Sequence, residues 1–245
     1  MNHPTNTIDV TRTSFVGVAL LALSAIGGFL IIRGFELLQS VLGFESFTLT
    51  FLVGGGLATL WFGVLGAVYL QFRPVKVHYG LRWPTRRDFG WIIGGVIAVV
   101  VVSVFAEIIF SSFRDGDATT ISAAAAVANP ITIYSIFIIG NFLFIAPLEE
   151  FLFRGVIQGR LRETFGPVAA ISITGIGFAL GHILSYWYGG SNVLSVSVVA
   201  ALFGIAATGM VLGAIYEQTE SLLIVTIIHG LVNALGIALA LAALL

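Results

Sequence analysis

The sequence predicts an all-α protein, a polytopic transmembrane helical bundle, and three observations support this. The chain has 245 residues, of which 58% are hydrophobic and only 9% are charged. Its mean hydropathy is +1.05, whereas soluble domains carry about 25% charged residues. Apolar stretches of about 20 residues, the length that crosses a bilayer, recur along the chain. We therefore expect a single transmembrane domain over residues 1–245, surrounded by membrane lipids.

The apolar stretches predict about seven spans, or 7–8 if the longest helix breaks. They cover residues 14–32, 47–70, 89–110, 131–161, 167–186, 193–216 and 221–245. Pro130 precedes the longest helix, and Gly166 with Pro167 separates it from the next, because proline begins a helix readily but interrupts one from inside. The alanine-rich residues 121–129 are predicted to form a short interfacial helix.

Basic residues in short loops predict the orientation, because such residues stay in the cytoplasm. Five lie between the second and third spans: Arg73, Lys76, Arg82, Arg86 and Arg87. We therefore expect an integral, multi-pass protein of the cell (plasma) membrane with a cytoplasmic N-terminus. The net charge of −1 argues against a nucleic-acid partner. The chain has no cysteine, which excludes a catalytic thiol and a thiolate metal site.

Three of the later spans carry ionisable or amide side chains within apolar runs. These are Glu149, Glu150 and Arg154, then His182, then His229 with Asn233. A charge at the bilayer centre costs roughly 2.5–3.5 kcal/mol on insertion scales. Such residues usually face a bundle interior or a wet cavity and indicate a function.

These polar residues are predicted to lie at a similar depth. At 1.5 Å per helical residue, Glu149 lies about 16 Å and His182 about 22 Å from the cytoplasmic ends of their spans. The same count gives about 12 Å for His229 and about 18 Å for Asn233. Because the core is about 30 Å thick and tilt absorbs the spread, we expect these groups to meet in a cavity inside the membrane.

Residue spacing within the spans predicts which side chains share a face. Glu150 and Arg154 are four residues apart and can pair along one helix, which leaves Glu149 pointing elsewhere. His229 and Asn233 are also four apart. Pro147 removes a backbone N–H and is predicted to displace the helix just before Glu149.

Small residues predict where helices approach closely. Gly177 with Gly181, and Gly209 with Gly213, each form a GxxxG pattern. Such faces let two helix backbones pack closely in a membrane. We interpret both as packing faces rather than as functional sites.

A glutamate, two histidines and an asparagine can together hydrolyse a peptide bond. Glu149 and His182 can activate a water molecule, and His229 with Asn233 can stabilise the oxyanion that forms. The sequence shows no cysteine and no Gly-x-Ser-x-Gly elbow, so a covalent nucleophile is not evident. Glu149, His182 and His229 are also a ligand set for zinc. Without a His-Glu-x-x-His helix we favour the metal-free reading, with zinc as the open alternative.

Three motifs in order resemble the CPBP intramembrane proteases, the family of the type II CAAX prenyl endopeptidases. They are Glu149-Glu150-x-x-x-Arg154, Phe178-x-x-x-His182 and His229-x-x-x-Asn233. The resemblance covers residues 131–245, which we expect to be the protease core; the first three spans carry no matching motif. It implies a membrane-embedded glutamate endopeptidase, often catalogued as a metallopeptidase, with Glu149, His182, His229 and Asn233 catalytic and with Glu150, Arg154 and Phe178 supporting.

The implied substrate is a membrane-associated peptide or a lipidated protein, because eukaryotic members of this family trim prenylated Cys-a-a-X proteins. Two other functions remain open. A proton-coupled transporter could use the same glutamates and histidines as a relay, and a non-catalytic bacteriocin self-immunity protein could keep the pocket without the reaction.

Overall fold

The computed structural model describes residues 7–73, 75–78, 84–113 and 130–242. The described residues are 89% helical and contain no strand, which confirms the predicted all-α class. Within the described residues, six helical runs are long and apolar enough to cross a membrane. The interfacial helix predicted at residues 121–129 lies outside the described residues.

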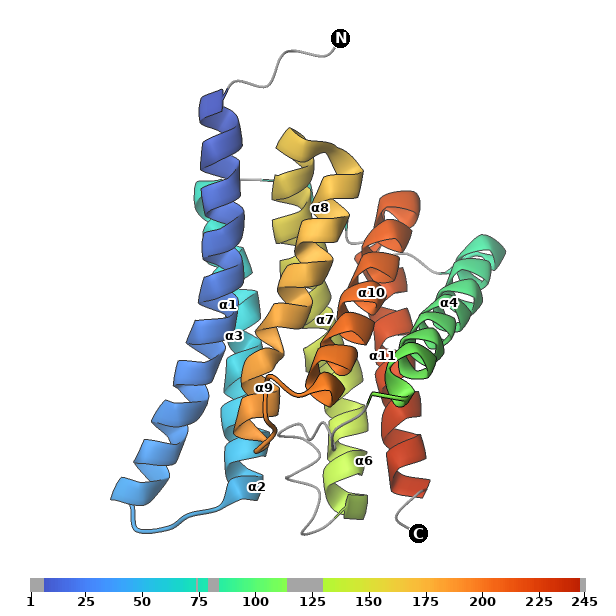
Figure 1. Ribbon diagram of the computed structural model, residues 1–245. Coiled ribbons are helices and arrows are strands. Elements are labelled where there is room, and N and C mark those ends of the chain that lie inside the picture. Colours follow the sequence, from blue (N-terminus) through green and yellow to red (C-terminus); the bar gives the residue numbers. More distant parts are fainter. Residues whose placement is uncertain (1–6, 74, 79–83, 114–129, 243–245) are drawn as a thin grey trace.

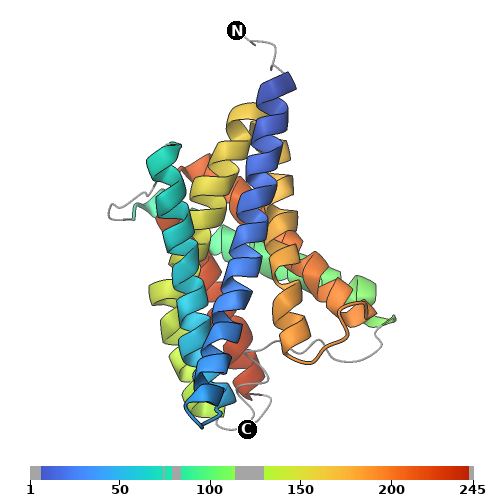
Figure 2. The ribbon, with the colours of Figure 1, turned by 90° about the vertical axis from the view of Figure 1, so that its left-hand side faces the viewer.

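The elements form a helical bundle (Figures 1 and 2). Among the described residues it includes three π-helical segments. In chain order they are α1 (Thr7–Val41), α2 (Phe47–Leu49), η1 (Thr50–Gly54), α3 (Gly55–Phe72), α4 (Arg86–Ser111), α6 (Pro130–Gly140), η2 (Asn141–Ile145), α7 (Ala146–Glu150), η3 (Phe151–Gln158), α8 (Gly159–Gly181), α9 (Ile183–Tyr188), α10 (Val196–Thr219) and α11 (Leu222–Ala242).

Where the sequence predicts about seven (7–8) spans, the described residues form six helical runs that are long and apolar enough to cross a membrane. The difference lies in Ile131–Tyr188, which the sequence divides into two spans and which is one helical run of 58 residues. Only Gly166, with φ 76° and ψ 174°, departs from helical angles at the predicted break in α8. The chain reverses at this residue (Figure 1). The two arms of α8 then lie against each other, because Leu161 and Ala170 belong to one buried cluster.

Capping side chains fix where several helices begin. Thr85 accepts a hydrogen bond from the Asp88 backbone N–H, and the Asp88 carboxylate accepts one from the Thr85 N–H at 2.7 Å, so α4 begins with a capping box. Ser195 caps α10 in the same way by accepting from Val198 N–H. Such caps satisfy backbone donors that have no partner within the helix.

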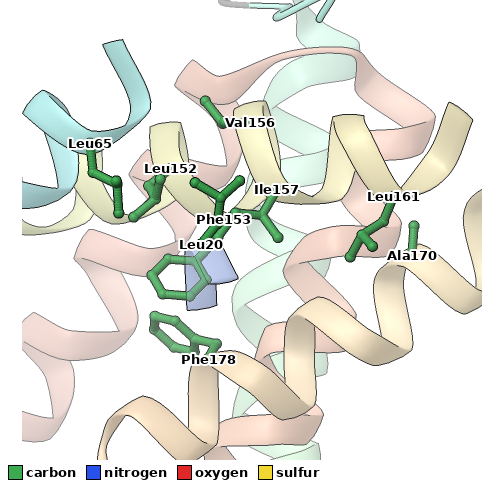
Figure 3. Close-up of a cluster of buried hydrophobic side chains, with 9 residues drawn as sticks. All are labelled: Leu20, Leu65, Leu152, Phe153, Val156, Ile157, Leu161, Ala170 and Phe178. Carbon is green, nitrogen blue, oxygen red and sulfur yellow. The ribbon is translucent and has the colours of Figure 1, made fainter. Parts of the chain in front are cut away.

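A buried apolar cluster surrounds η3 and fixes its position in the bundle (Figure 3). Leu152, Phe153, Val156 and Ile157 project from η3 and are at most 3% exposed. They meet side chains from α1, α3 and α8: Leu20, Leu65, Leu161, Ala170 and Phe178. Because interiors are close-packed, this cluster holds η3 and the residues just before it in one orientation.

The second arm of α8 meets α10 through glycines. A Cβ added to Gly209 would lie 3.1 Å from the Gly175 Cα, so the two backbones are nearly in contact. The close approach predicted at Gly209 is confirmed, and its partner is Gly175. Gly177 packs against the Leu21 side chain of α1. The spacing of glycines along one helix does not determine which neighbouring helix the glycine face contacts.

The Gly175 contact gives a stability prediction. We expect Gly175→Ala to destabilise the protein by about 1–3 kcal/mol, the usual cost of overpacking. The reason is that its Cβ would lie 3.0 Å from the Ala206 O and 3.1 Å from the Met210 N, which are backbone atoms. The measurement is thermal unfolding in detergent.

Gly181→Ala is the matched control. A Cβ at Gly181 meets nothing nearer than 4.0 Å, and alanine is the better helix former, so stability should hold or rise slightly. Equal midpoints for the two variants would contradict the proposed contact.

Candidate active site

The glutamate pair lies on a helix that changes from π-helical to α-helical geometry and back to π-helical geometry. The five residues of α7 are flanked by the π-helical η2 and η3, and Pro147 stands in the first turn of α7. Pro147 contributes no N–H, so the backbone at this point cannot keep a regular α-helical ladder. The displacement predicted before Glu149 therefore takes the form of a π-helical turn. Such turns are frequent at functional sites.

Glu150 is the most enclosed ionisable group of the site. It is 0% exposed, and its Oε1 lies 3.0 Å from Arg154 Nη1, an ion pair by distance although not an aligned hydrogen bond. The pairing predicted from the four-residue spacing is therefore present. The same Oε1 lies 2.7 Å from His229 Nδ1, a contact that the sequence did not predict. Because a carboxylate accepts, the Nδ1–H of His229 donates to Glu150.

Arg154 is also fully enclosed, and three groups hold it. Besides Glu150, its Nη2 donates to the Gly209 carbonyl at 3.3 Å, and its guanidinium carbon lies 4.9 Å from the centre of the Phe178 ring. Cation–π contacts of this kind are strongest when the charge is desolvated. The close backbone approach at Gly209 thus also brings a carbonyl within reach of Arg154.

Phe178 lies between the arginine and both histidines. Its ring meets His182 edge-on at 4.7 Å and His229 at 6.1 Å between centroids. His182 Nδ1 donates to the Phe178 carbonyl at 2.9 Å. This hydrogen bond fixes the ring and leaves Nε2 as the unengaged nitrogen of His182.

Glu149 points away from the Glu150–Arg154 pair, as the sequence predicted. Its side chain is 13% exposed, and its Oε2 lies 3.7 Å from His229 Nε2. His229 therefore lies between the two glutamates, with Nδ1 on Glu150 and Nε2 toward Glu149. The supporting role that the resemblance implies for Glu150 is directed at His229 rather than at Glu149, and Arg154 pairs with Glu150.

Asn233 is oriented by a second asparagine to which we assigned no role. Asn141, 0% exposed, donates from Nδ2 to the Gly230 carbonyl at 3.0 Å, so its Oδ1 must face the other way. That oxygen accepts from Asn233 Nδ2 at 2.9 Å. One N–H of the Asn233 amide remains for another acceptor. Asn141 is itself a polar residue in an apolar run, and that signal could have found it.

One cavity of about 910 Å³ joins these groups. Its lining includes all four predicted catalytic residues and Phe178, whereas Glu150 and Arg154 lie behind the wall. The rest of the lining is mainly apolar and comes from α1, η1, α3, α4, α6, η2, η3, α8, α9, α10 and α11. A few polar groups that converge on a mostly apolar cavity are typical of a binding site for a largely apolar ligand.

The zinc alternative finds no support in this geometry. Among the residues that the structure describes, no three histidine, cysteine, aspartate or glutamate side chains are grouped so that they could hold a metal ion. Glu149, His182 and His229 therefore do not fit a closed three-ligand zinc site. The preference for metal-free chemistry stays a prediction.

The part of the chain that carries the site is similar to a known protein family. Residues 131–235 match the family model of the Rce1-like type II CAAX prenyl endopeptidases. This match confirms the predicted resemblance, and all seven predicted site residues lie within the matched range. No curated protein and no solved structure gives a significant match.

Residues 131–235 are therefore similar to a family of type II CAAX prenyl endopeptidases. Together with six apolar helical runs among the described residues, this similarity indicates a multi-pass integral membrane protein. The first three spans lie outside the matched range, although α1 and α3 contribute to the cavity of the Rce1-like domain.

The enclosed ion pair of the Rce1-like domain gives a second stability prediction. We expect Arg154→Met to cost about 3–5 kcal/mol, because removal of one partner leaves Glu150 charged and enclosed. The double variant Arg154→Met/Glu150→Gln should cost less than the single one, since it no longer encloses a carboxylate. Unfolding by sodium dodecyl sulfate titration measures both.

Arg33→Met is the matched control, because Arg33 pairs with Glu36 on the exposed side of α1. An exposed pair contributes at most about 1 kcal/mol. Equal unfolding midpoints of Arg154→Met and Arg33→Met in the sodium dodecyl sulfate titration would show that the enclosed pair does not stabilise the protein.

Proposed function

We propose that this protein is an intramembrane endopeptidase that hydrolyses a peptide bond of a membrane-associated or lipidated substrate. The observation that carries the proposal is the position of His229 between two carboxylates at the wall of a large apolar cavity. The match of residues 131–235 to a peptidase family supports the same reaction.

In the proposed reaction Glu149 is the general base. A water molecule gives a proton to the Glu149 carboxylate as its oxygen attacks the substrate carbonyl carbon, and Glu149 later returns that proton to the leaving amine nitrogen. His182 lines the same cavity with Nε2 unengaged and can hydrogen-bond the same water. A positioned general base contributes about 10²–10⁴-fold to the rate.

In the same reaction His229 and Asn233 stabilise the negative charge that develops on the carbonyl oxygen. Nε2 is the cavity-facing nitrogen of His229, because Nδ1–H is engaged by Glu150. It can donate to the oxyanion when both ring nitrogens carry a proton. The second N–H of Asn233 adds a neutral donor, and donors fixed before the reaction need no reorganisation during it.

Hydrolysis agrees better with the cavity than transport does. A proton pathway needs polar groups that reach both ends of the bundle. Here the apolar cluster around η3, with Leu152, Val156 and Ile157 all 0% exposed, fills the interior beyond the site. A cavity that is closed on one side suits a reaction chamber.

Glu149→Gln tests the proposal, because glutamine keeps the size of the side chain but cannot accept the proton. We expect wild-type cells to contain C-termini of membrane polypeptides that are absent from Glu149→Gln cells at equal protein level. C-terminal peptide mass spectrometry of membrane fractions measures this. The purified variant should keep the wild-type unfolding midpoint.

Glu45→Gln is the control, since Glu45 is exposed and does not line the cavity. Identical sets of C-termini in wild type and Glu149→Gln would overturn the proposed role of Glu149.

Asn141 gives a prediction for a positioning residue. The substrate is a peptide identified from those C-termini. We expect Asn141→Ala to lower kcat by about tenfold or more. Complete loss of an oxyanion donor lowers kcat by about 10²–10³, and this variant would keep Asn233 but leave it misoriented. KM should change little, because the Asn141 side chain is fully enclosed.

Asn192→Ala is the matched control, because the exposed Asn192 bonds only its own turn through Leu194 N–H. A rise in KM with unchanged kcat in Asn141→Ala would contradict the positioning role.

A further inference from the structure

The start of α1, the end of α3 and the first arm of α8 meet at one end of the bundle (Figure 2). Thr13 of α1 and Thr164 of α8 share a hydrogen bond of 2.9 Å, and Arg160 Nη2 donates to Thr13 Oγ1 at 3.3 Å. Tyr69, one turn before the end of α3, packs against the apolar cluster around η3. Polar side chains thus gather where three helices from distant parts of the chain meet.

Two buried donors at this junction have no hydrogen-bond partner among the described residues. They are the Tyr69 hydroxyl and the Arg160 Nε–H. Of the charged groups around Tyr69, Arg160 acts on its hydroxyl most strongly, so the two side chains are neighbours. The phenol oxygen could accept from the guanidinium, yet no such bond forms. Because an unsatisfied buried donor is destabilising, this pair indicates a third group that accepts from both.

The charges around this pair favour an anion as the third group. Arg160 and Arg12 both act on the Tyr69 hydroxyl, and the carboxylate that opposes them is Glu163. Glu163 pairs with Arg160 Nη1 at 2.5 Å, but its side chain is 46% exposed, so water screens the pair. Arg73 adds a further exposed positive charge one turn beyond Tyr69, where its backbone N–H donates to the Tyr69 carbonyl at 2.9 Å.

The position of the junction along the helices favours a lipid as the source of that anion. Thr13 and Tyr69 lie about one turn from the ends of the apolar helices Asp9–Val41 and Phe47–Phe72, the level at which headgroups begin. Phe15 and Phe72, close to them in sequence, are 74% and 75% exposed, as expected of side chains that face acyl chains. Basic pockets between transmembrane helices at this level are typical sites for lipid headgroups.

We propose that the junction of α1, α3 and α8 binds the phosphate of an anionic lipid headgroup. The Arg160 Nε–H and the Tyr69 O–H donate to phosphate oxygens, while Arg12 and Arg73 contribute positive charge at the rim. A phosphate has several acceptor oxygens and can therefore satisfy both buried donors at once. This binding does not depend on the proposed hydrolysis.

Binding at this site would stabilise the arrangement of helices around the cavity. Both α1 and α3 contribute to the cavity lining, and α8 continues the helical run that begins with the glutamate pair. A headgroup held between α3 and α8, beside the contact of Arg160 with Thr13, joins all three helices at one end. We therefore expect the lipid to raise the unfolding midpoint of the protein as well as to bind it.

Native mass spectrometry of the purified full-length protein in detergent tests the proposal. The probes are phosphatidylglycerol and phosphatidylcholine with identical acyl chains, which differ in net charge. We expect the first phosphatidylglycerol to bind about tenfold more tightly than the first phosphatidylcholine, because basic side chains favour the anionic headgroup. The thermal unfolding midpoint should rise with phosphatidylglycerol and stay nearly constant with phosphatidylcholine.

Tyr69→Phe removes only the hydroxyl and is the most specific variant. We expect it to weaken phosphatidylglycerol binding by about tenfold, the effect of losing a hydrogen bond to a charged group. Its unfolding midpoint without lipid should equal or exceed that of the wild type, because the lost hydroxyl had no partner. Tyr134→Phe is the control, since Tyr134 lies in α6 at the opposite end of the bundle (Figure 1).

Arg12→Gln tests the charge at a position where folding is not at risk, because Arg12 is exposed. It should weaken phosphatidylglycerol binding several-fold. Arg87→Gln is its control: it removes the same charge from an exposed position at the start of α4, away from the junction. Equal losses in the two arginine variants would mean that the net charge of the protein, and not this site, attracts the lipid, and would overturn the proposal.

Two further outcomes would also overturn it. One is unchanged phosphatidylglycerol binding in Tyr69→Phe, and the other is equal binding of the two lipids by the wild type. Inorganic phosphate alone should leave the unfolding midpoint unchanged. A rise equal to that given by phosphatidylglycerol, lost in Tyr69→Phe, would assign the site to a free phosphate and overturn the lipid as its source. None of these measurements requires hydrolysis, so they remain decisive if the protein is not a peptidase.

Discussion

The site depends on one enclosed carboxylate, Glu150, held between Arg154 and His229. A charge in an apolar interior is tolerated only when opposite charges and hydrogen bonds surround it. Arg154 supplies the charge, and it needs the Gly209 carbonyl and the Phe178 ring around it. The close contact of α8 with α10 and the orientation of His229 therefore belong to one electrostatic arrangement.

Two neighbouring glutamates differ because the helix turns about 100° from one residue to the next. Glu150 points into the protein and is 0% exposed, while the Glu149 side chain is 13% exposed at the cavity wall. One carboxylate can thus hold a histidine in place while the other reaches water and substrate. The π-helical turns on both sides of α7 allow this local placement without moving the rest of the helix.

The features that could be predicted from the sequence are those that depend on residue spacing within one helix and on the apolar environment of the membrane. The all-α bundle followed from composition, and the Glu150–Arg154 pair followed from their four-residue spacing. The sequence missed the contact of His229 with Glu150, because spacing within one helix does not fix its rotation toward another. The count is six helical runs rather than about seven because Gly166, where the chain reverses, is the one residue that departs from helical angles in a run of 58 residues. Asn141 was passed over because its partners, Asn233 and Gly230, are about 90 residues away in the chain.

The membrane also explains why the cavity is closed on one side. The proposed hydrolysis needs water at Glu149, yet water that reached the enclosed Glu150 and Arg154 would weaken their attraction by raising the local dielectric. A cavity that stops at Phe153 and Phe178 gives Glu149 access to water and keeps the aromatic side chains between solvent and the ion pair. The apolar cluster around η3 is therefore a requirement of the electrostatics.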